Sequence, residues 1–144
     1  MMSINIQFSE RFEKIVGANI SNIADKALQR TIVEADSICQ TEAPIDTGNL
    51  RRSIGTSHPG LCRVCLTCNA HYWVYVQYGT SAHTITGNPL AWKGDDGKMH
   101  YARQVSHPGT EANPFVTRTA KRIIGDQLIQ KNIKDMLSSE GILG

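Results

Sequence analysis

The sequence predicts an α+β fold: a curved, mostly antiparallel sheet flanked by a long N-terminal helix and a C-terminal helix, with a protruding hairpin. Apolar residues recur with the 3.6-residue period of a helix between Ser9 and Pro44 and again after Asn113. In the segments between, they alternate with the period of a strand, and turn residues separate those segments. The 144 residues suit a single domain, 1–144, with one core.

A short strand and a long helix open the chain. Apolar and polar side chains alternate over residues 3–8, which is typical of a half-buried strand. An amphipathic helix follows from Ser9, and we expect residues 17–19, which begin with a glycine, to break or kink it. Pro44 ends this helix because proline lacks an amide proton and forces the preceding residue out of the helical region.

Turns follow the helix. Residues 46–48 read Asp-Thr-Gly and predict a rigid reversal, since Asp and Thr side chains accept hydrogen bonds from nearby amides. Residues 57–60 and 106–109 both read Ser-His-Pro-Gly. A Pro-Gly pair is typical of a type II turn because the third position needs a positive φ.

Residues 61–80 predict two strands that are separated by a break near Asn69 and Ala70. In the first strand, the even-numbered positions are apolar and share one face; they are Cys62, Val64, Leu66 and Cys68. In the second strand, the side chains that share a face are Tyr72, Val74, Val76 and Tyr78.

An excursion over residues 81–112 interrupts the compact part of the chain. Two alternating segments, 89–92 and 99–105, flank a turn that contains Asp-Gly, which is a strong hairpin signal. A lone hairpin is marginal in water, and exposed apolar patches mark contact surfaces. We therefore expect this hairpin to be mobile in the isolated chain and ordered against a neighbouring subunit. Its predicted interface residues are Trp92, Met99 and Tyr101.

The last predicted element is a helix with Asn113 as its N-cap and Pro114 at its first position, where both residue types are favoured. Apolar residues at helical spacing continue to Leu137, and Gly125 interrupts the pattern. Residues 138–144 are predicted to form a flexible tail.

Composition narrows the class of protein. No apolar run reaches the length of about 20 residues that spans a bilayer, and no secretory signal opens the chain, so we expect neither secretion nor membrane contact. Residues 1–50 hold 4 Lys or Arg against 7 Asp or Glu, and residues 51–144 hold 11 against 6. Opposite poles suit stacking of subunits, although two solvated faces would give the same division.

The sequence contains few patterns that are typical of a metal-binding or catalytic site. Cys62, Cys65 and Cys68 have the Cys-x-x-Cys spacing of zinc sites, but on a strand Cys65 points away from the other two, so one ion cannot collect all three. We expect free thiols, no metal and no cofactor. No nucleophile elbow, zinc-protease helix or phosphate-binding loop occurs, so no enzymatic activity is expected.

The arginines allow two interpretations. The guanidinium groups of Arg51, Arg52 and Arg63 match phosphate in shape. Binding to the DNA backbone generally needs several clustered cations, so ion pairs between subunits or a solvated face are favoured instead.

Three motifs occur in order along the chain. Residues 43–54 read Ala-Pro-Ile-Asp-Thr-Gly-Asn-Leu-Arg-Arg-Ser-Ile, residues 75–80 read Tyr-Val-Gln-Tyr-Gly-Thr, and residues 113–115 read Asn-Pro-Phe. In that order they resemble the siphophage tail-component family, small head-to-tail joining or tail-completion proteins of the virion neck. The positions that match the family pattern are Asp46, Thr47, Gly48, Leu50, Arg51, Ser53, Tyr72, Tyr75, Val76, Tyr78, Gly79, Thr80, Pro114 and Phe115.

The resemblance implies a structural virion protein of a phage or prophage, present in the host cytoplasm during assembly. It implies a ring of identical subunits between capsid and tail, or a monomer when isolated. The implied partners are further copies, other head-connector or tail-tube proteins, and passing DNA through transient, non-specific contact. Trp73 replaces a usual small residue and Gln77 a usual Glu, which implies a bulkier surface and a missing charged contact.

A different class remains as the alternative, namely a small zinc-binding or nucleic-acid-binding regulatory protein. Only the three cysteines at 62, 65 and 68 and the modest basic excess favour it.

Overall fold

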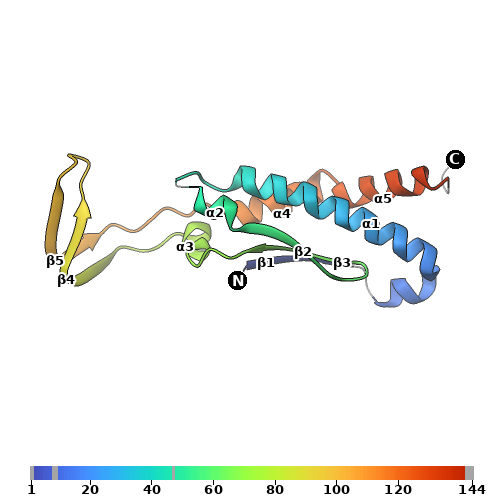
Figure 1. The fold of residues 1–144 in the computed structure, drawn as a ribbon, viewed down its shortest axis with the longest axis horizontal. Helices are drawn as coiled ribbons and strands as arrows, with labels where there is room; N and C mark the ends of the chain where they lie inside the picture. Colours follow the sequence, from blue (N-terminus) through green and yellow to red (C-terminus); the bar gives the residue numbers. More distant parts are fainter. Residues whose placement is uncertain (1, 8–9, 47, 142–144) are drawn as a thin grey trace.

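The computed structural model describes residues 2–7, 10–46 and 48–141 and has the predicted α+β fold. It is elongated, with a body of helices layered on a three-stranded sheet and a hairpin that projects from one end (Figure 1). The strands of the body are β1 (Met2–Gln7), β2 (Ile54–Gly60) and β3 (Arg63–Cys68), and the hairpin consists of β4 (His83–Lys93) and β5 (Met99–His107). We call residues 83–107 the arm.

The sheet of the body is antiparallel throughout, in the order β1-β3-β2. β1 confirms the predicted first strand within the described residues, while Phe8 lies outside them. The predicted alternation in β3 is also confirmed, because all four even-numbered side chains from Cys62 to Cys68 are at most 1% exposed. These side chains form the inner face of the sheet, toward α1 (Glu10–Glu42).

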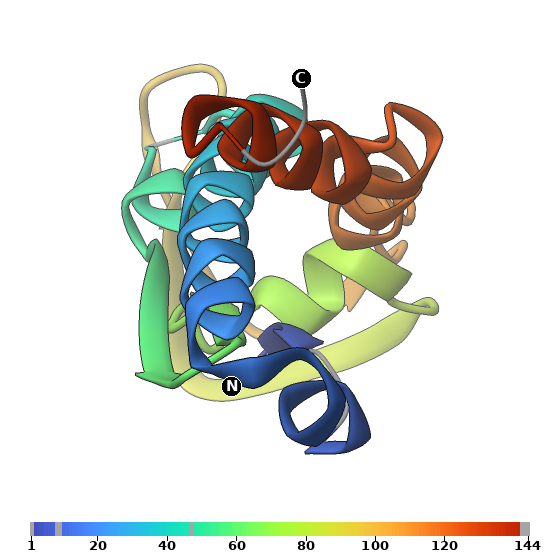
Figure 2. The same cartoon turned by 90° about the vertical axis from the view of Figure 1, so that its right-hand side faces the viewer.

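Helix α1 is continuous from Glu10 to Glu42, so residues 17–19 do not break it. Its first turns run at an angle to the rest (Figures 1 and 2), so the helix has a kink, which is the other outcome that the sequence predicted. The helix ends two residues before Pro44, as predicted.

The turn between β2 and β3 lies later than predicted. β2 continues through Pro59 and Gly60, and residues 61–62 make the turn, where Cys62 has a φ of 54°. Asp25 of α1 holds this unusual conformation, because its carboxylate accepts a hydrogen bond from the Cys62 amide. A contact between residues distant in sequence thus outweighs the local Pro-Gly signal. The second Ser-His-Pro-Gly segment differs, because β5 ends at His107 and Gly109 has the positive φ, 92°, that the Pro-Gly signal predicts.

The second predicted strand of residues 61–80 is wrong, because this segment forms the short helix α3 (Trp73–Tyr78). Trp73 and Val76 pack on the core, and Gln77 is buried beside them. Val76 and Gln77 follow Trp73 by three and four residues, which is the spacing of side chains on one face of a helix. Tyr72 and Tyr78, which were predicted to share a buried strand face, are exposed instead.

Two C-terminal helices, α4 (Phe115–Gly125) and α5 (Leu128–Ser139), pack against α1. The predicted interruption at Gly125 is confirmed, since α4 ends there. Ser138 and Ser139 belong to α5, so the predicted tail begins too early, and residues 142–144 lie outside the described residues. Among the helices of the described residues, none is long and apolar enough to cross a membrane.

The core lies between α1, the sheet and α4. Its largest fully buried apolar side chains are Phe115, Leu28, Leu66 and Val64. The buried region also contains a polar contact between α5 and α1. The side-chain amide of Asn132, a fully buried residue of α5, donates a hydrogen bond to Thr31 Oγ1 of α1 at 3.1 Å. The described residues between Gly79 and Pro114 contribute nothing to this core. The body is therefore complete without the arm.

Candidate assembly interface

The three motif segments lie together around the C-terminal end of α1. The first motif follows α1 and includes α2 (Asn49–Arg52), the second forms α3, and the third leads into α4. A hollow of about 380 Å³ separates the first two motifs. The described residues that line it are Pro44, Asp46, Gly48, Asn49, Leu50, Tyr72 and Val76. Residues that were singled out from distant parts of the sequence thus share one surface.

The first motif reverses sharply at Gly48, whose φ is 76°. A Cβ here would lie 3.0 Å from Nη1 of Arg52, so glycine suits both the backbone and the space. The positive φ agrees with the predicted reversal, although Thr47 lies outside the described residues. Leu50 is buried behind the turn, and Ser53 Oγ donates to its carbonyl at 2.6 Å. The motif is therefore fixed to the body.

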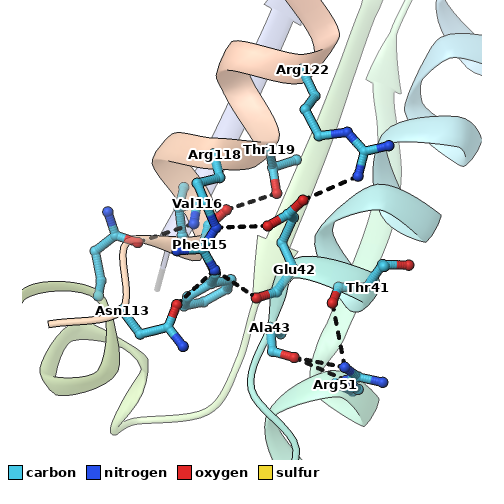
Figure 3. A network of polar contacts seen from close by, with 11 residues as sticks. Thr41, Glu42, Ala43, Arg51, Asn113, Phe115, Val116, Arg118, Thr119 and Arg122 are labelled. Atoms are coloured by element: carbon cyan, nitrogen blue, oxygen red, sulfur yellow. Dashed lines mark hydrogen bonds and ion pairs between the residues drawn. The ribbon is translucent and has the colours of Figure 1, made fainter. Parts of the chain in front are cut away.

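Arg51 of the first motif binds the end of α1. Its Nη2 lies 2.8 Å from the carbonyl oxygen of Ala43 and 3.4 Å from that of Thr41, and its Nε donates to Ala43 as well (Figure 3). Carbonyl groups at a helix C-terminus lack amide partners, and arginine satisfies them well. The structure thus gives Arg51 an internal partner that neither interpretation of the sequence named.

Glu42, in the last turn of α1, joins this helix to α4. Arg118 Nε donates to its Oε2 at 2.6 Å and Arg122 Nη1 to its Oε1 at 3.1 Å (Figure 3). Arg118 also donates to the backbone carbonyl of Glu42 at 2.9 Å and to Asn113 Oδ1 at 2.6 Å. The hydrogen bonds from Arg118 and then Arg122 hold the pKa of Glu42 below its ordinary value.

Gln77 of the second motif caps α4, although it lies 39 residues before Val116. Its Oε1 accepts a hydrogen bond from the Val116 amide at 3.0 Å, and its Nε2 donates to Thr117 Oγ1 at 2.8 Å. The first amides of a helix have no partner within the helix, so Gln77 supplies what a local cap usually does. The departure from Glu at this position therefore affects a buried contact in the subunit.

The predicted cap, Asn113, is wrong by one residue. The N-cap of α4 is Pro114, which offers no side-chain hydrogen bond, and Phe115 is the first helical residue. Asn113 instead donates its backbone N–H to the carbonyl of Val76 at 2.8 Å. Phe115 is fully buried, so the third motif serves as an anchor in the core and not as an exposed contact.

The second motif also presents an exposed aromatic surface. Tyr75 and Tyr78, three residues apart on α3, are 60% and 70% exposed, and Tyr72 precedes them at the same spacing. We call these three residues the tyrosine face. Tyrosine is enriched at protein interfaces because its ring is apolar and its hydroxyl tolerates water. These are the exposed aromatic residues among the described family positions; Asp46 and Pro114 are exposed as well.

A narrow base joins the arm to the body. Thr80 and Thr110 exchange two backbone hydrogen bonds, at 2.9 and 3.0 Å. Gly79 and Gly109 have φ values of 71° and 92°, and a Cβ on either would lie 2.5 or 2.3 Å from the carbonyl oxygen of the opposite threonine. Only glycine permits this close approach. We call these four residues the arm base; sequence reasoning identified two of them by motif and missed the pairing.

The arm exposes the apolar side chains that were predicted as its interface. Trp92, Met99 and Tyr101 are 41%, 53% and 65% exposed. Ile85, Leu90, Ala91, Trp92, Val105 and His107 line a hollow of about 340 Å³. β4 and β5 pack chiefly on each other. The arm therefore has apolar surface and no body beneath it to cover that surface.

The cysteines follow the predicted parity. Cys62 and Cys68 are buried, while Cys65 is partly exposed on the other face, where its thiol donates to Asn5 Oδ1. Burial raises the pKa of Cys39 to about 11, which makes this thiol unreactive. Within residues 2–7, 10–46 and 48–141, no group of three His, Cys, Asp or Glu side chains is placed to hold a metal ion.

Sequence reasoning missed the contact between Asp25 and His58. Asp25 Oδ1 lies 2.8 Å from His58 Nε2, and Gln29 donates to Oδ2 at 2.7 Å. Burial alone would raise the pKa of Asp25, but these hydrogen bonds and that from the Cys62 amide lower it. The contact ties β2 and the β2–β3 turn to α1. Neither Asp25 nor His58 belongs to one of the three motifs.

No family model matches the chain, and no curated protein or solved structure matches it either. The functional argument accordingly depends on the motifs and on the contacts between them.

Proposed function

We propose that this chain is a structural protein of a siphophage neck, at the head-tail connection or in tail completion, and that it acts by assembly with no catalytic step. The motifs that resemble the tail-component family support the proposal because their segments lie together around the C-terminal end of α1, next to the base of the arm. Phe115 and Arg51 shape the subunit from within, whereas Tyr75, Tyr78 and the arm face outward.

The single observation that carries the proposal is the uncovered arm. A two-stranded hairpin is marginal in water by itself, and exposed apolar side chains favour contact with a partner. Trp92 lies on β4, and Met99 and Tyr101 lie on β5, the two strands that project away from the body (Figure 1). A protein whose activity is assembly needs such a surface, because it contacts its neighbours through side chains that the single chain leaves uncovered.

Two outward surfaces suit a ring of subunits. Rings form when two different patches of one molecule meet in a head-to-tail contact. The tyrosine face supplies one patch for a neighbouring copy. The arm supplies another, for a neighbouring subunit or for the next ring of the neck. DNA would pass through the ring with transient, non-specific contact, in the virion and not in a regulatory complex.

The test is to delete residues 89–105 and close the gap with a short Gly-Ser loop. Because the described residues of the arm contribute nothing to the core, the deleted protein should remain folded and soluble. It should fail to restore infectious particles when it replaces the intact gene in the phage or prophage that carries it. Negative-stain images of the intact protein, alone and with virion components, should show rings.

Two outcomes would contradict this proposal. A deleted protein that still joins heads to tails would show that the arm is not an assembly element. A purified intact protein that holds one zinc per chain, with metal and fold both lost in Cys62→Ser, would favour the regulatory alternative. A sequence-specific DNA complex at physiological salt would do the same, since affinity for the backbone alone falls steeply with salt.

A further inference from the structure

The two strands of the arm differ in how their outer edges are protected. β4 is irregular, because its register against β5 shifts between Thr86 and Leu90 and because Pro89 has no N–H to offer. β5 runs from Met99 to His107 without glycine or proline, and within the part of the chain that the structure describes no third strand pairs with its outer edge. Proteins usually protect such edges with bulges, prolines or charges. β4 carries such protection, and β5 has little beyond Arg103.

We propose that the β5 strands of two copies of this chain pair antiparallel along these outer edges, with the two-fold axis at Ala102. The product is a four-stranded sheet in the order β4-β5-β5-β4, which covers both unprotected edges. The inference goes beyond the virion role, because it specifies a contact and a register between identical chains and requires no other component.

The side chains of β5 select this register. Successive side chains alternate between faces, so Met99, Tyr101, Arg103 and Val105 share one face. With the axis at Ala102, Tyr101 lies opposite Arg103 of the second copy, and Met99 lies opposite Val105. Each pair occurs twice. A tyrosine ring opposite a guanidinium is a cation–π contact, and the Met–Val pair is apolar, so both pairs are favourable.

The neighbouring registers are worse. An axis at Arg103 would use the whole strand but would place two guanidinium groups directly opposite each other, which is destabilising. An axis at Tyr101 would shorten the overlap and place Met99 opposite Arg103, and Val105 would face the turn residue Gly97. The repulsion between two Arg103 side chains thus disfavours the register centred on Arg103, and the pairs that Tyr101 and Met99 make favour the register centred on Ala102.

The pairing would also order the part of the arm that lacks support. Tyr101 and Met99 are 65% and 53% exposed in the single chain, and a second pair of strands beside them would remove part of both from water. Three or more strands are generally needed for an independently stable sheet, and two paired arms supply four. This two-fold contact joins two chains and does not by itself close a ring. It corresponds to the contact of the arm with the next ring in the proposed function, and it leaves the tyrosine face available to a neighbouring subunit.

Disulfide cross-linking of the full chain tests the register. Both variants carry Cys65→Ser, which removes the partly exposed native thiol. In Ala102→Cys, the new residues oppose each other with Cα atoms about 5 Å apart, within the range of a disulfide. In Gln104→Cys, the matched control on the same strand, the two cysteines are displaced by four residues, about 14 Å. We expect a covalent dimer from the first variant under mild oxidation and little from the second.

A charge exchange tests the same contact without cysteine. Tyr101→Lys places a lysine opposite Arg103 of the second copy and should weaken dimerisation about tenfold in sedimentation experiments. Adding Arg103→Glu restores opposite charges and should recover the dimer. Equal cross-linking at 102 and 104, growth into larger aggregates, or a wild-type chain that stays monomeric at high concentration would each overturn the pairing. These measurements use the isolated protein, so they are independent of the complementation test of virion assembly.

Discussion

The body and the arm both contain antiparallel strands, yet only the strands of the body have helices that cover their apolar side chains. In the body, the inner side chains of β3 are covered by α1, and Phe115 of α4 completes the core. In the arm, Trp92 and Tyr101 meet water, and the base that joins the arm to the body is a single bridge between Thr80 and Thr110. The comparison teaches that the body covers its apolar side chains within the chain, whereas the arm leaves its own exposed. We therefore expect the order of the arm to depend on a partner.

The largest expected effect separates the two regions by removing one aromatic side chain from each. Phe115→Ala should lower the free energy of unfolding by about 3–5 kcal/mol, because it leaves a cavity in a closed core. Tyr101→Ala should change it by less than about 0.5 kcal/mol, as is usual for an exposed position. Urea unfolding followed by circular dichroism measures both at a protein concentration that keeps the chain monomeric.

A loss of more than about 2 kcal/mol in Tyr101→Ala would break the comparison, since it would mean that the arm belongs to the cooperative unit of the body. The same result would remove the basis for treating residues 83–107 as an interface.

A smaller effect is expected at the junction of the motifs. Gln77→Ala should cost about 1–2 kcal/mol, because the Val116 amide and the Thr117 hydroxyl lose a buried partner. Gln77→Glu keeps an acceptor for the amide and should recover part of the loss, since a carboxylate is favoured at a helix N-terminus. The same unfolding curves provide the test, and equal loss in both variants would show that the hydrogen bond to Val116 is not what stabilises α4.

Stability of the body should fall in acid. A carboxyl group whose pKa is lowered by folding stabilises the chain above its ordinary pKa, and that contribution is lost as pH falls through the lowered value. Hydrogen bonds lower the pKa of both Glu42 and Asp25, so both act in this direction. The urea midpoint should therefore fall between pH 7 and about pH 3, and it should fall less steeply in Glu42→Gln. Identical slopes would show that the Arg118 contact carries no pH dependence.

The smallest global effect is expected at the arm base. Gly109→Ala should leave the unfolding midpoint of the body unchanged and open the bridge, because a Cβ there lies 2.3 Å from the Thr80 carbonyl oxygen and the φ of 92° is strained for alanine. Hydrogen exchange at the Thr80 and Thr110 amides should be faster, with Gly97→Ala as the control: that position also has a positive φ but has open space around it. Unchanged exchange at Thr80 would contradict a strained base.

Elements with local signals were predictable from the sequence. The alternation in β3, the end of α1 before Pro44, the Gly125 interruption and the Asp-Gly hairpin each follow from residues close together in the chain. Such signals depend on backbone geometry and the burial period, which neighbouring residues determine.

Two of the errors have the same cause, which is contact between distant residues. The alternation of aromatic residues over 72–78 is typical of a strand, but the segment is helical. As a helix it directs Gln77 inward, where this side chain binds Val116 and Thr117, some 40 positions later. The β2–β3 turn moved because Asp25 binds the Cys62 amide. Local patterns hold no information about either partner, so a motif can indicate which residues matter without indicating what each one contacts.

The arm extends far from the two glycines of its base. β4 has 11 residues, so at about 3.3 Å per residue its tip lies about 35 Å from the base. A rotation of about ten degrees at that base moves the tip by about 6 Å, roughly the spacing of two strand residues. We expect any rotation at the base to widen the range of positions from which the tip could meet a partner. Binding would end such a motion, so the base would determine both how far the tip travels and how much conformational freedom binding removes.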